Sequence, residues 1–311
     1  MQVFLEENSV SGEAGTKFQN TAVALGCFDA LHIGHQAIIK KVVAAAKTEG
    51  LTPLVYFFIN QPRSVLLGQE IPHIYPLPKR LQILEELGVE VAVAKRFTKE
   101  YMSCSPQQFV EECLCGQLDA KMVAAGFNYR FGENGSGNIQ TLEELGKPLG
   151  IRVCGVDCVK QGNEVVSSTR IRQLIKKGEM MDANACLGRT FSIEGEVLSG
   201  NQIGRKMAFP TANLEFPKEQ ILPKFGVYIT KTCADGKWVP SITNVGQRPT
   251  VEEGKGYIET HLLDYNGDLY GKKIEVTFCQ YLRDIQKFPD IQSLQKQLNR
   301  DKETAKKYFA K

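Results

Sequence analysis

The sequence lacks the features that would take it out of the ordinary globular class. The longest clearly apolar run, residues 54–59, is far shorter than the roughly 20 residues that a membrane-spanning helix needs. Nine cysteines are present, but they are irregularly spaced and form no pair of CxxC elements, which argues against a zinc site. The N-terminus carries Glu6 and Glu7 in place of a basic and then apolar leader. We therefore predict a cytoplasmic protein with reduced thiols and no membrane partner.

Strong charge of one sign is also missing. The chain has 38 Lys and Arg against 35 Asp and Glu, so its formal net charge is only +3. Nucleic-acid-binding proteins usually carry a clear excess of positive charge, which this chain does not have, so no nucleic-acid partner is predicted. At roughly 150 residues per domain, the 311 residues indicate about two domains.

Short apolar strands alternate with helices in the first part of the chain. Strands are predicted over residues 21–26, 52–59, 89–94, 122–126 and 152–156. Helices are predicted over residues 35–47, 79–87 and 105–114, the last opened by Ser105 and Pro106 as N-cap and first helical residue. Thr141 and Glu144 form a capping box before a further short helix. The alternation predicts a doubly wound parallel α/β sheet.

A β-rich pattern replaces the alternation after about residue 188. Strands are predicted over residues 191–198, 226–230, 238–244, 257–263 and 273–281, separated by turn residues. A final helix is predicted over residues 291–308. This pattern indicates a small antiparallel β-barrel with a C-terminal helix. We place the two domains at residues 1–185 and 186–311.

Two of the four histidines, His32 and His35, lie between the first strand and the first helix. Because they are three residues apart, a helical first turn puts both imidazoles on one face. The helix N-terminus adds free N–H groups and positive potential at the same place. Together these groups can hold nucleotide phosphates and stabilise charge on an α-phosphate under attack.

A second phosphate-binding candidate lies at a later predicted helix start. Ser168 and Thr169 supply hydroxyls beside free N-terminal amides, and Arg172 can reach a β- or γ-phosphate oxygen. Taken alone, the segment is equally typical of an ordinary helix cap.

The β-rich part contains a third constellation of candidate residues. Gly204 permits close approach of phosphates, and Lys206 or Arg205 can add positive charge. Thr211 and Asn213 alternate in an extended segment, so their hard oxygen ligands point the same way and suit magnesium. Glu259 lies on an alternating strand, where its carboxylate could accept a proton from a hydroxyl being phosphorylated. The alternatives for these segments are a plain turn and a solvated glutamate.

The first half of the chain resembles the FMN adenylyltransferase module of bacterial riboflavin kinase/FAD synthetases. The first motif of that family, GxFDGxHxGH, reads GCFDALHIGH from residue 26 to residue 35, and an SSTxxR signature follows at residues 167–172. A segment matching the family also stands at residues 128–132. By resemblance, the ATP site contains His32, His35, Ser168, Thr169 and Arg172, with Gly26, Phe28 and Asp29 of the same motif. The resemblance also implies that Asn128 lies in the nucleotide or flavin site.

Residues 185–311 resemble riboflavin kinase. The match includes FPTAN at residues 209–213, NVGQRPT at residues 244–250 and ETHLLD at residues 259–264. By resemblance, Thr211 and Asn213 bind magnesium–ATP, Glu259 is the catalytic base, and Arg283 lies near the flavin. The implied reactions are phosphorylation of riboflavin to FMN by ATP, and adenylylation of FMN to FAD with release of pyrophosphate. Riboflavin, FMN, FAD and ATP are thus the expected ligands.

The chain departs from the family pattern at a few positions. Ala30 stands where the family usually has glycine, and Gln61 stands where it usually has histidine. Gly135 replaces a usual basic residue, and Asn138 replaces a usual acidic one. Ile285 stands where an acidic residue is common. These departures motivate an alternative, a riboflavin kinase with a weak or redirected adenylyltransferase. A flavin-binding regulator without catalysis is a second alternative, although a pure binder would need no base. A class I aminoacyl-tRNA synthetase is disfavoured, since no KMSKS loop accompanies the HIGH letters.

Overall fold

A computed structural model describes residues 1–6, 17–198, 210–247 and 256–310. The chain divides into two compact units, Met1–Ser168 and Thr169–Lys311. This division precedes the sequence-based boundary because the helix α8 (Met180–Leu187) packs against the barrel strand β14 (Lys273–Arg283). In that packing, the side-chain amide of Asn184 donates to the carbonyl of Phe278 at 2.9 Å. The boundary between residues 185 and 186 stays a prediction.

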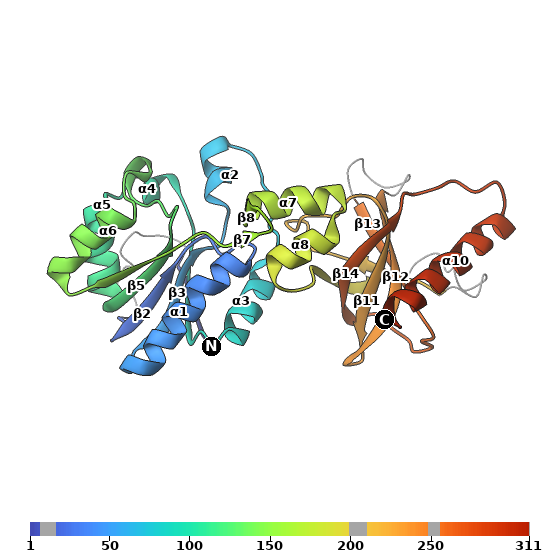
Figure 1. The fold of residues 1–311 in the computed structure, drawn as a ribbon, viewed down its shortest axis with the longest axis horizontal. Helices are drawn as coiled ribbons and strands as arrows, with labels where there is room; N and C mark the ends of the chain where they lie inside the picture. Colours follow the sequence, from blue (N-terminus) through green and yellow to red (C-terminus); the bar gives the residue numbers. More distant parts are fainter. Residues whose placement is uncertain (7–16, 199–209, 248–255, 311) are drawn as a thin grey trace. The chain divides into compact units, whose positions relative to one another are not determined.

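Unit 1 is built on a six-stranded sheet in which every neighbouring pair is parallel (Figure 1). The strand order is β1-β4-β3-β2-β5-β6. The strands are β1 (Gln2–Glu6), β2 (Thr21–Leu25), β3 (Thr52–Phe58), β4 (Val91–Lys95), β5 (Ala120–Gly126) and β6 (Arg152–Val156). Every residue of β2 and β4 is buried, as expected for strands covered on both faces. The doubly wound parallel sheet predicted from the sequence is confirmed.

The main helix of unit 1 is α1 (Ile33–Glu49), which packs across β2, β3 and β5. Its buried residues recur at helical spacing, with Ile38, Ile39, Val42 and Ala46 on the side facing the sheet. It ends at Gly50, whose φ of 68° is the left-handed conformation that glycine adopts without steric cost. The other helices of unit 1 are α2 (Pro62–Leu67), α3 (Leu77–Glu86), α4 (Lys99–Met102), α5 (Pro106–Gln108) and α6 (Ile139–Gly146).

Of two helix starts predicted from the sequence, the one at Ser105 is confirmed and the one at Thr141 is wrong. Ser105 does cap α5, and its partner in the capping box is Gln108. The chain then continues as a π-helix, Phe109–Gln117, where an α-helix was predicted. The predicted capping box of Thr141 and Glu144 is wrong. Helix α6 begins earlier because the side chain of Asn138 accepts the Thr141 amide at 3.0 Å.

Unit 2 contains a closed antiparallel barrel with the strand order β10-β13-β12-β11-β14-β9. The helix α7 (Ser168–Lys177) precedes α8, and α10 (Ile291–Phe309) follows the barrel and packs against β12 (Figure 1). The barrel strands are β9 (Ser192–Leu198), β10 (Ala212–Glu215), β11 (Gly226–Ala234), β12 (Lys237–Gln247), β13 (Gly256–Leu262) and β14. The predicted barrel with a C-terminal helix is confirmed.

The barrel interior holds a cluster of hydroxyl groups among its apolar side chains. Five of them are fully buried and hydrogen-bond to one another at 2.8 to 3.3 Å. They belong to Thr230, Thr232, Ser241, Thr243 and Thr260. Since side chains alternate along a strand, the immediate strand neighbours of these residues point outward, and Glu259, which precedes Thr260 on β13, is one of them.

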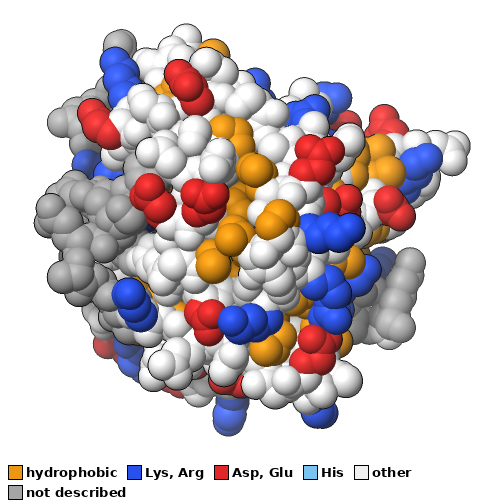
Figure 2. All heavy atoms as spheres, turned by 90° about the vertical axis from the view of Figure 1, so that its left-hand side faces the viewer, with side chains coloured by type: hydrophobic (Ala, Val, Ile, Leu, Met, Phe, Trp, Pro, Cys, Tyr) orange, Lys and Arg blue, Asp and Glu red, His pale blue; other side chains and the backbone are white. Residues whose placement is uncertain are grey.

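The surface of unit 1 shows no dominant sign of charge on the face drawn in Figure 2, among the described atoms. Acidic and basic side chains are interspersed there, and apolar side chains form a band between them. This mixture agrees with the formal net charge of +3.

Candidate functional site

His32 and His35 meet at the start of α1, where the sequence placed them. His32 is the N-cap, and its Nδ1 accepts the backbone N–H of His35 at 3.2 Å. The two rings stack with centroids 3.7 Å apart and planes 16° apart. Because Nδ1 of His32 is the acceptor, the proton of the neutral ring sits on Nε2, which is therefore a donor.

Both imidazoles are held in the neutral form by burial. Desolvation lowers the pKa of His32 from 6.5 to about 4. Desolvation, with a smaller contribution from His32, also lowers the pKa of His35 well below its usual value. Nδ1 of His35 is buried and has no hydrogen-bond partner among the described residues. At neutral pH the pair thus offers ring N–H groups, while the helix N-terminus supplies the positive potential.

The loop before α1 has the constrained backbone typical of a binding site. Phe28 and Leu31 adopt positive φ angles of 44° and 45°. The Phe28 ring packs against His35 in an edge-to-face contact with centroids 5.1 Å apart. A Cβ at Gly26 would lie 3.0 Å from that ring, so the close approach needs glycine. Ala30 is not among the residues with a positive φ angle, so its backbone conformation does not require the glycine that the family usually has there.

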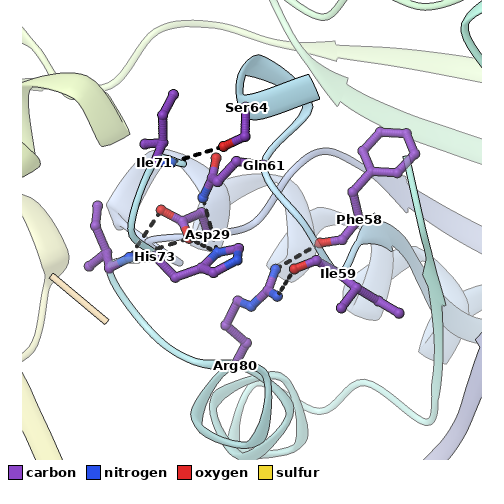
Figure 3. A network of polar contacts seen from close by, with 9 residues as sticks. Asp29, Phe58, Ile59, Gln61, Ser64, Ile71, His73 and Arg80 are labelled. Carbon is purple, nitrogen blue, oxygen red and sulfur yellow. Dashed lines mark hydrogen bonds and ion pairs between the residues drawn. The ribbon is translucent and has the colours of Figure 1, made fainter. Parts of the chain in front are cut away.

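A polar network surrounds Asp29 in the same loop, as Figure 3 shows. Asp29 is only 2% exposed, and its Oδ1 lies 2.8 Å from Nδ1 of His73. The backbone N–H of Ile74 donates to both carboxylate oxygens at 3.3 Å. The side-chain amide of Gln61 lies 3.1 Å from the same ring nitrogen of His73. His73 was not among the predicted site residues, although it is one of only four histidines in the chain.

Arg80 of α3 fastens this helix to the end of β3 (Figure 3). It is 1% exposed, and its guanidinium donates to the carbonyls of Phe58 and Ile59 at 2.8 and 2.7 Å. Burial lowers the pKa of Arg80, while Asp29 and Cys27 raise it. These contacts hold the loops after β2 and β3 at the carboxyl edge of the sheet, where open α/β sheets bind ligands.

The remaining departures of unit 1 have structural roles. Gln61 is the N-cap residue of α2, and Asn138 caps α6. Gly135 has a φ of 64°, so it supplies a left-handed turn position. Replacement of the family's charged residues therefore leaves the local backbone well formed.

An aromatic cluster that was not predicted from the sequence lies at the same edge of the sheet. The partly exposed rings of Phe58, Phe97 and Tyr101 pack together with centroids 5.0 to 5.7 Å apart. The Tyr101 hydroxyl lies 3.2 Å from that of Tyr56, and burial raises the pKa of both phenols. The sequence did contain a signal for this cluster, because Phe58 ends β3 and Phe97 follows the end of β4. Such a cluster can stack against a flat ring system.

For the other predicted residues of the nucleotide site, the structure gives the position within a helix or loop but no contact with the histidine pair. Asn128 is exposed and follows the carboxyl end of β5. Ser168, Thr169 and Arg172 do lie in the first turns of α7, as the motif predicted. Ser168 ends unit 1, whereas Thr169 and Arg172 belong to unit 2. Their approach to the histidine pair stays a prediction.

The candidate residues of unit 2 fall on one row across the barrel. Asn213 of β10 is the cross-strand partner of Glu259 on β13. Glu259 is in turn the partner of Asn244 on β12. Val227 of β11 continues the row, with Asn244 on one side and Arg283 of β14 on the other. Cross-strand partners share a face with Cβ atoms about 5 Å apart, so Asn213, Glu259 and Asn244 form one polar surface.

Thr211 joins this surface from just before β10. Its hydroxyl donates to Oε1 of Glu259 at 2.5 Å. Because the hydroxyl proton is committed to Glu259, the oxygen lone pairs of Thr211 remain available to a hard cation. The amide oxygen of an asparagine is a ligand of the same hard class. Thr211 and Asn213 thus fit a magnesium ion. The predicted phosphate-binding residues Gly204 and Lys206 lie outside the described residues.

Arg283 has a structural partner that the sequence did not reveal. Its guanidinium makes a two-pronged ion pair with Asp301 of α10, at 2.7 to 3.1 Å. Asp301 is 3% exposed and also accepts from the side-chain amide of Gln297 at 2.9 Å. The pair fastens α10 to the barrel and holds Arg283 in place at the end of the polar row.

The buried imidazoles predict a loss of stability in acid. The unfolded chain takes up the His32 proton near pH 6.5 and the folded chain only near pH 4, so stability falls as the pH falls through this window. Between pH 7 and pH 5, the free energy of unfolding of unit 1 should drop by about 2 kcal/mol on account of His32. Denaturant titrations followed by far-UV circular dichroism would measure it.

His32→Asn is the matched variant for this prediction, since asparagine keeps a capping oxygen but does not titrate. Its unfolding should depend less on pH than that of the unmodified protein. The single tryptophan, Trp238, lies in unit 2, so its fluorescence provides an internal control that the substitution should leave unchanged. An identical pH dependence in both proteins would contradict the assignment.

Two family profiles match the chain, one over each unit. A profile described as FAD synthetase matches residues 15–170, and one described as riboflavin kinase matches residues 187–309. No helix in the described residues is long and apolar enough to cross a membrane. Within the same residues, no group of three or more His, Cys, Asp or Glu side chains could hold a metal ion.

Several relatives are similar over almost the whole chain. The bifunctional riboflavin kinase/FMN adenylyltransferase of Listeria monocytogenes is 33% identical over 295 residues, which covers 94% of this chain and 93% of the relative. The protein of the same name from Bacillus subtilis is 33% identical over 296 residues, with 93% of both chains covered. A crystal structure titled macrolide-efflux protein, from Streptococcus pneumoniae, superposes with a TM-score of 0.88 at 27% identity. It covers 98% of this chain and 99% of its own.

Proposed function

Because this chain belongs to the family of bifunctional riboflavin kinase/FMN adenylyltransferases, we propose that the polar row of unit 2 phosphorylates riboflavin and that the histidine pair of unit 1 adenylylates FMN. The enzyme is a transferase of flavin cofactor synthesis. ATP is the donor in both reactions, and the flavin products are FMN and then FAD.

The hydrogen bond between Thr211 and Glu259 is the observation that carries the kinase assignment. It links the proposed catalytic base directly to a proposed cation ligand. The 5′-hydroxyl of riboflavin would give its proton to the Glu259 carboxylate as its oxygen bonds to the γ-phosphorus of ATP and the bond from that phosphorus to ADP breaks. In such a reaction the protein acts mainly by positioning the reactants and neutralising charge.

Magnesium is the proposed cation of unit 2. When bound, it would neutralise charge on the ATP phosphates. Thr211 and Asn213 would hold it, and they lie on the same surface as Glu259.

For the adenylyltransferase, we assign His32 and His35 to the triphosphate of a second ATP. An oxygen of the FMN phosphate attacks the α-phosphorus, and pyrophosphate leaves. The ring N–H groups of the neutral imidazoles and the N-terminal amides of α1 can donate to the phosphate oxygens as charge develops there. Neither histidine has to transfer a proton.

The aromatic cluster of Phe58, Phe97 and Tyr101 is the proposed surface for the flavin ring in unit 1. Its rings are partly exposed and lie at the carboxyl edge of the sheet that also carries the histidines. Stacking against it would suit the flat isoalloxazine ring. The departures at Ala30 and Gln61 are accommodated in well-formed loops, which weakens the case for a redirected N-terminal unit.

A product assay with riboflavin, excess ATP and magnesium tests both activities. Chromatography should show FMN first and FAD later, and FMN supplied directly should yield FAD. Chelation with EDTA should stop FMN formation, and excess magnesium should restore it. FMN without any FAD would refute the assignment of unit 1, and no FMN would refute that of unit 2.

A cytoplasmic location is also proposed. All nine cysteines belong to the described residues, and none of them forms a disulfide. Nine cysteines outside disulfides suit a reducing compartment.

A further inference from the structure

The amide of Asn244 lies within the polar row but takes no part in the proposed catalytic contacts. It is the cross-strand partner of Glu259, one strand away on the side opposite to Asn213. Its side-chain Nδ2 donates to the Tyr257 hydroxyl at 2.8 Å. Its Oδ1 is buried and has no hydrogen-bond partner in the described parts of the chain. A buried amide oxygen left unpaired is costly, so a ligand group that donates a hydrogen bond is the expected partner.

The amide is held in place from a neighbouring strand. Tyr257 is the cross-strand partner of Gly246, and a Cβ at Gly246 would come within 2.9 Å of the Tyr257 ring. The glycine therefore leaves room for the ring of Tyr257, whose hydroxyl accepts from Asn244. This support fixes one end of the amide and leaves the other end for a ligand.

The position of Asn244 in the row indicates which part of a bound riboflavin it would contact. Strands are spaced about 4.8 Å apart, so Asn244 lies one strand from Glu259 and two strands from Arg283. A riboflavin whose 5′-hydroxyl is at Glu259 extends through its ribityl hydroxyls before its ring system begins. Because Glu259 lies on one side of Asn244 in the row and Arg283 on the other, Asn244 lies beside the ribityl chain of such a ligand.

We infer that Asn244 recognises a ribityl hydroxyl of riboflavin through its buried Oδ1, and so selects flavins that carry the polyol chain. This inference rests on the proposed kinase function of unit 2. Asn244 touches the substrate but not the transferred phosphate. It should therefore determine affinity and specificity for the flavin more than the rate of phosphoryl transfer.

The test compares riboflavin with lumiflavin, which has the same ring system but a methyl group in place of the ribityl chain. Quenching of flavin fluorescence would give both dissociation constants, with magnesium and ADP present so that no turnover occurs. In Asn244→Ala, the dissociation constant for riboflavin should rise about 10-fold or more, while that for lumiflavin should change less than about 2-fold. Equal losses for both flavins, or undiminished riboflavin binding, would overturn the inference.

Two further variants keep the test decisive. Asn244→Asp retains an acceptor oxygen, so it should bind riboflavin more tightly than Asn244→Ala, and it serves if the alanine variant folds poorly. Thr243→Ala is the matched control on the same strand, because its hydroxyl points into the barrel interior. It should lower the melting temperature without changing the ratio of the two affinities. FMN formation by the unmodified protein is measured separately, so failure of the kinase proposal would be visible on its own.

Discussion

Substitution of Glu259 by glutamine should reduce the turnover of riboflavin to FMN by about 10²- to 10⁴-fold, the range for loss of a general base. Glutamine has nearly the same size and keeps an oxygen that can accept the Thr211 hydroxyl, so the local hydrogen bond survives. What it lacks is a carboxylate to take the proton of the 5′-hydroxyl. Steady-state kinase assays at saturating riboflavin and ATP would measure the loss in kcat.

The second unit of the same molecule provides the control for this variant. FMN supplied directly should be adenylylated by Glu259→Gln at the rate of the unmodified protein, since the histidine pair belongs to unit 1. A variant that phosphorylates riboflavin at full rate would remove Glu259 from the role of base. Loss of both activities together would indicate misfolding, which circular dichroism would detect.

Substitution of His35 by alanine should have the converse effect. FAD formation from FMN and ATP should fall by about 10²- to 10³-fold, as for the loss of one preorganised donor to developing negative charge. The ring of His35 stacks on His32 at 3.7 Å and meets the edge of Phe28, so its removal also loosens the neighbouring donor. Riboflavin phosphorylation in unit 2 should be unaffected.

His35→Gln separates the two contributions of the ring. Its side-chain amide keeps an N–H donor, so its activity should lie between those of the unmodified protein and His35→Ala. The decrease should appear in kcat more than in KM, because the interaction is proposed to strengthen in the transition state. Activity equal to that of the unmodified enzyme in both variants would show that His35 is a structural residue of the loop.

Local patterns determined which elements form and which chemistry each segment carries. Alternation of strands and helices predicted the parallel sheet of unit 1, and period-two strands with turn residues predicted the barrel of unit 2. The spacing of His32 and His35 placed both rings at one helix start, since three residues in a first turn leave little freedom. Helix capping was less predictable: Asn138 and Thr141 both suit a cap, and in the structure Asn138 is the N-cap residue.

Tertiary structure alone decided which distant residues meet. Cross-strand register brought Asn244 beside Glu259, and no local pattern fixes how far one strand slides along its neighbour. The ion pair of Arg283 with Asp301 depends on how α10 packs against the barrel. His73 reaches Asp29 across 44 residues of sequence because two loops converge at one edge of a sheet. Motifs thus determined the reactions, while long-range packing decided which side chains support them.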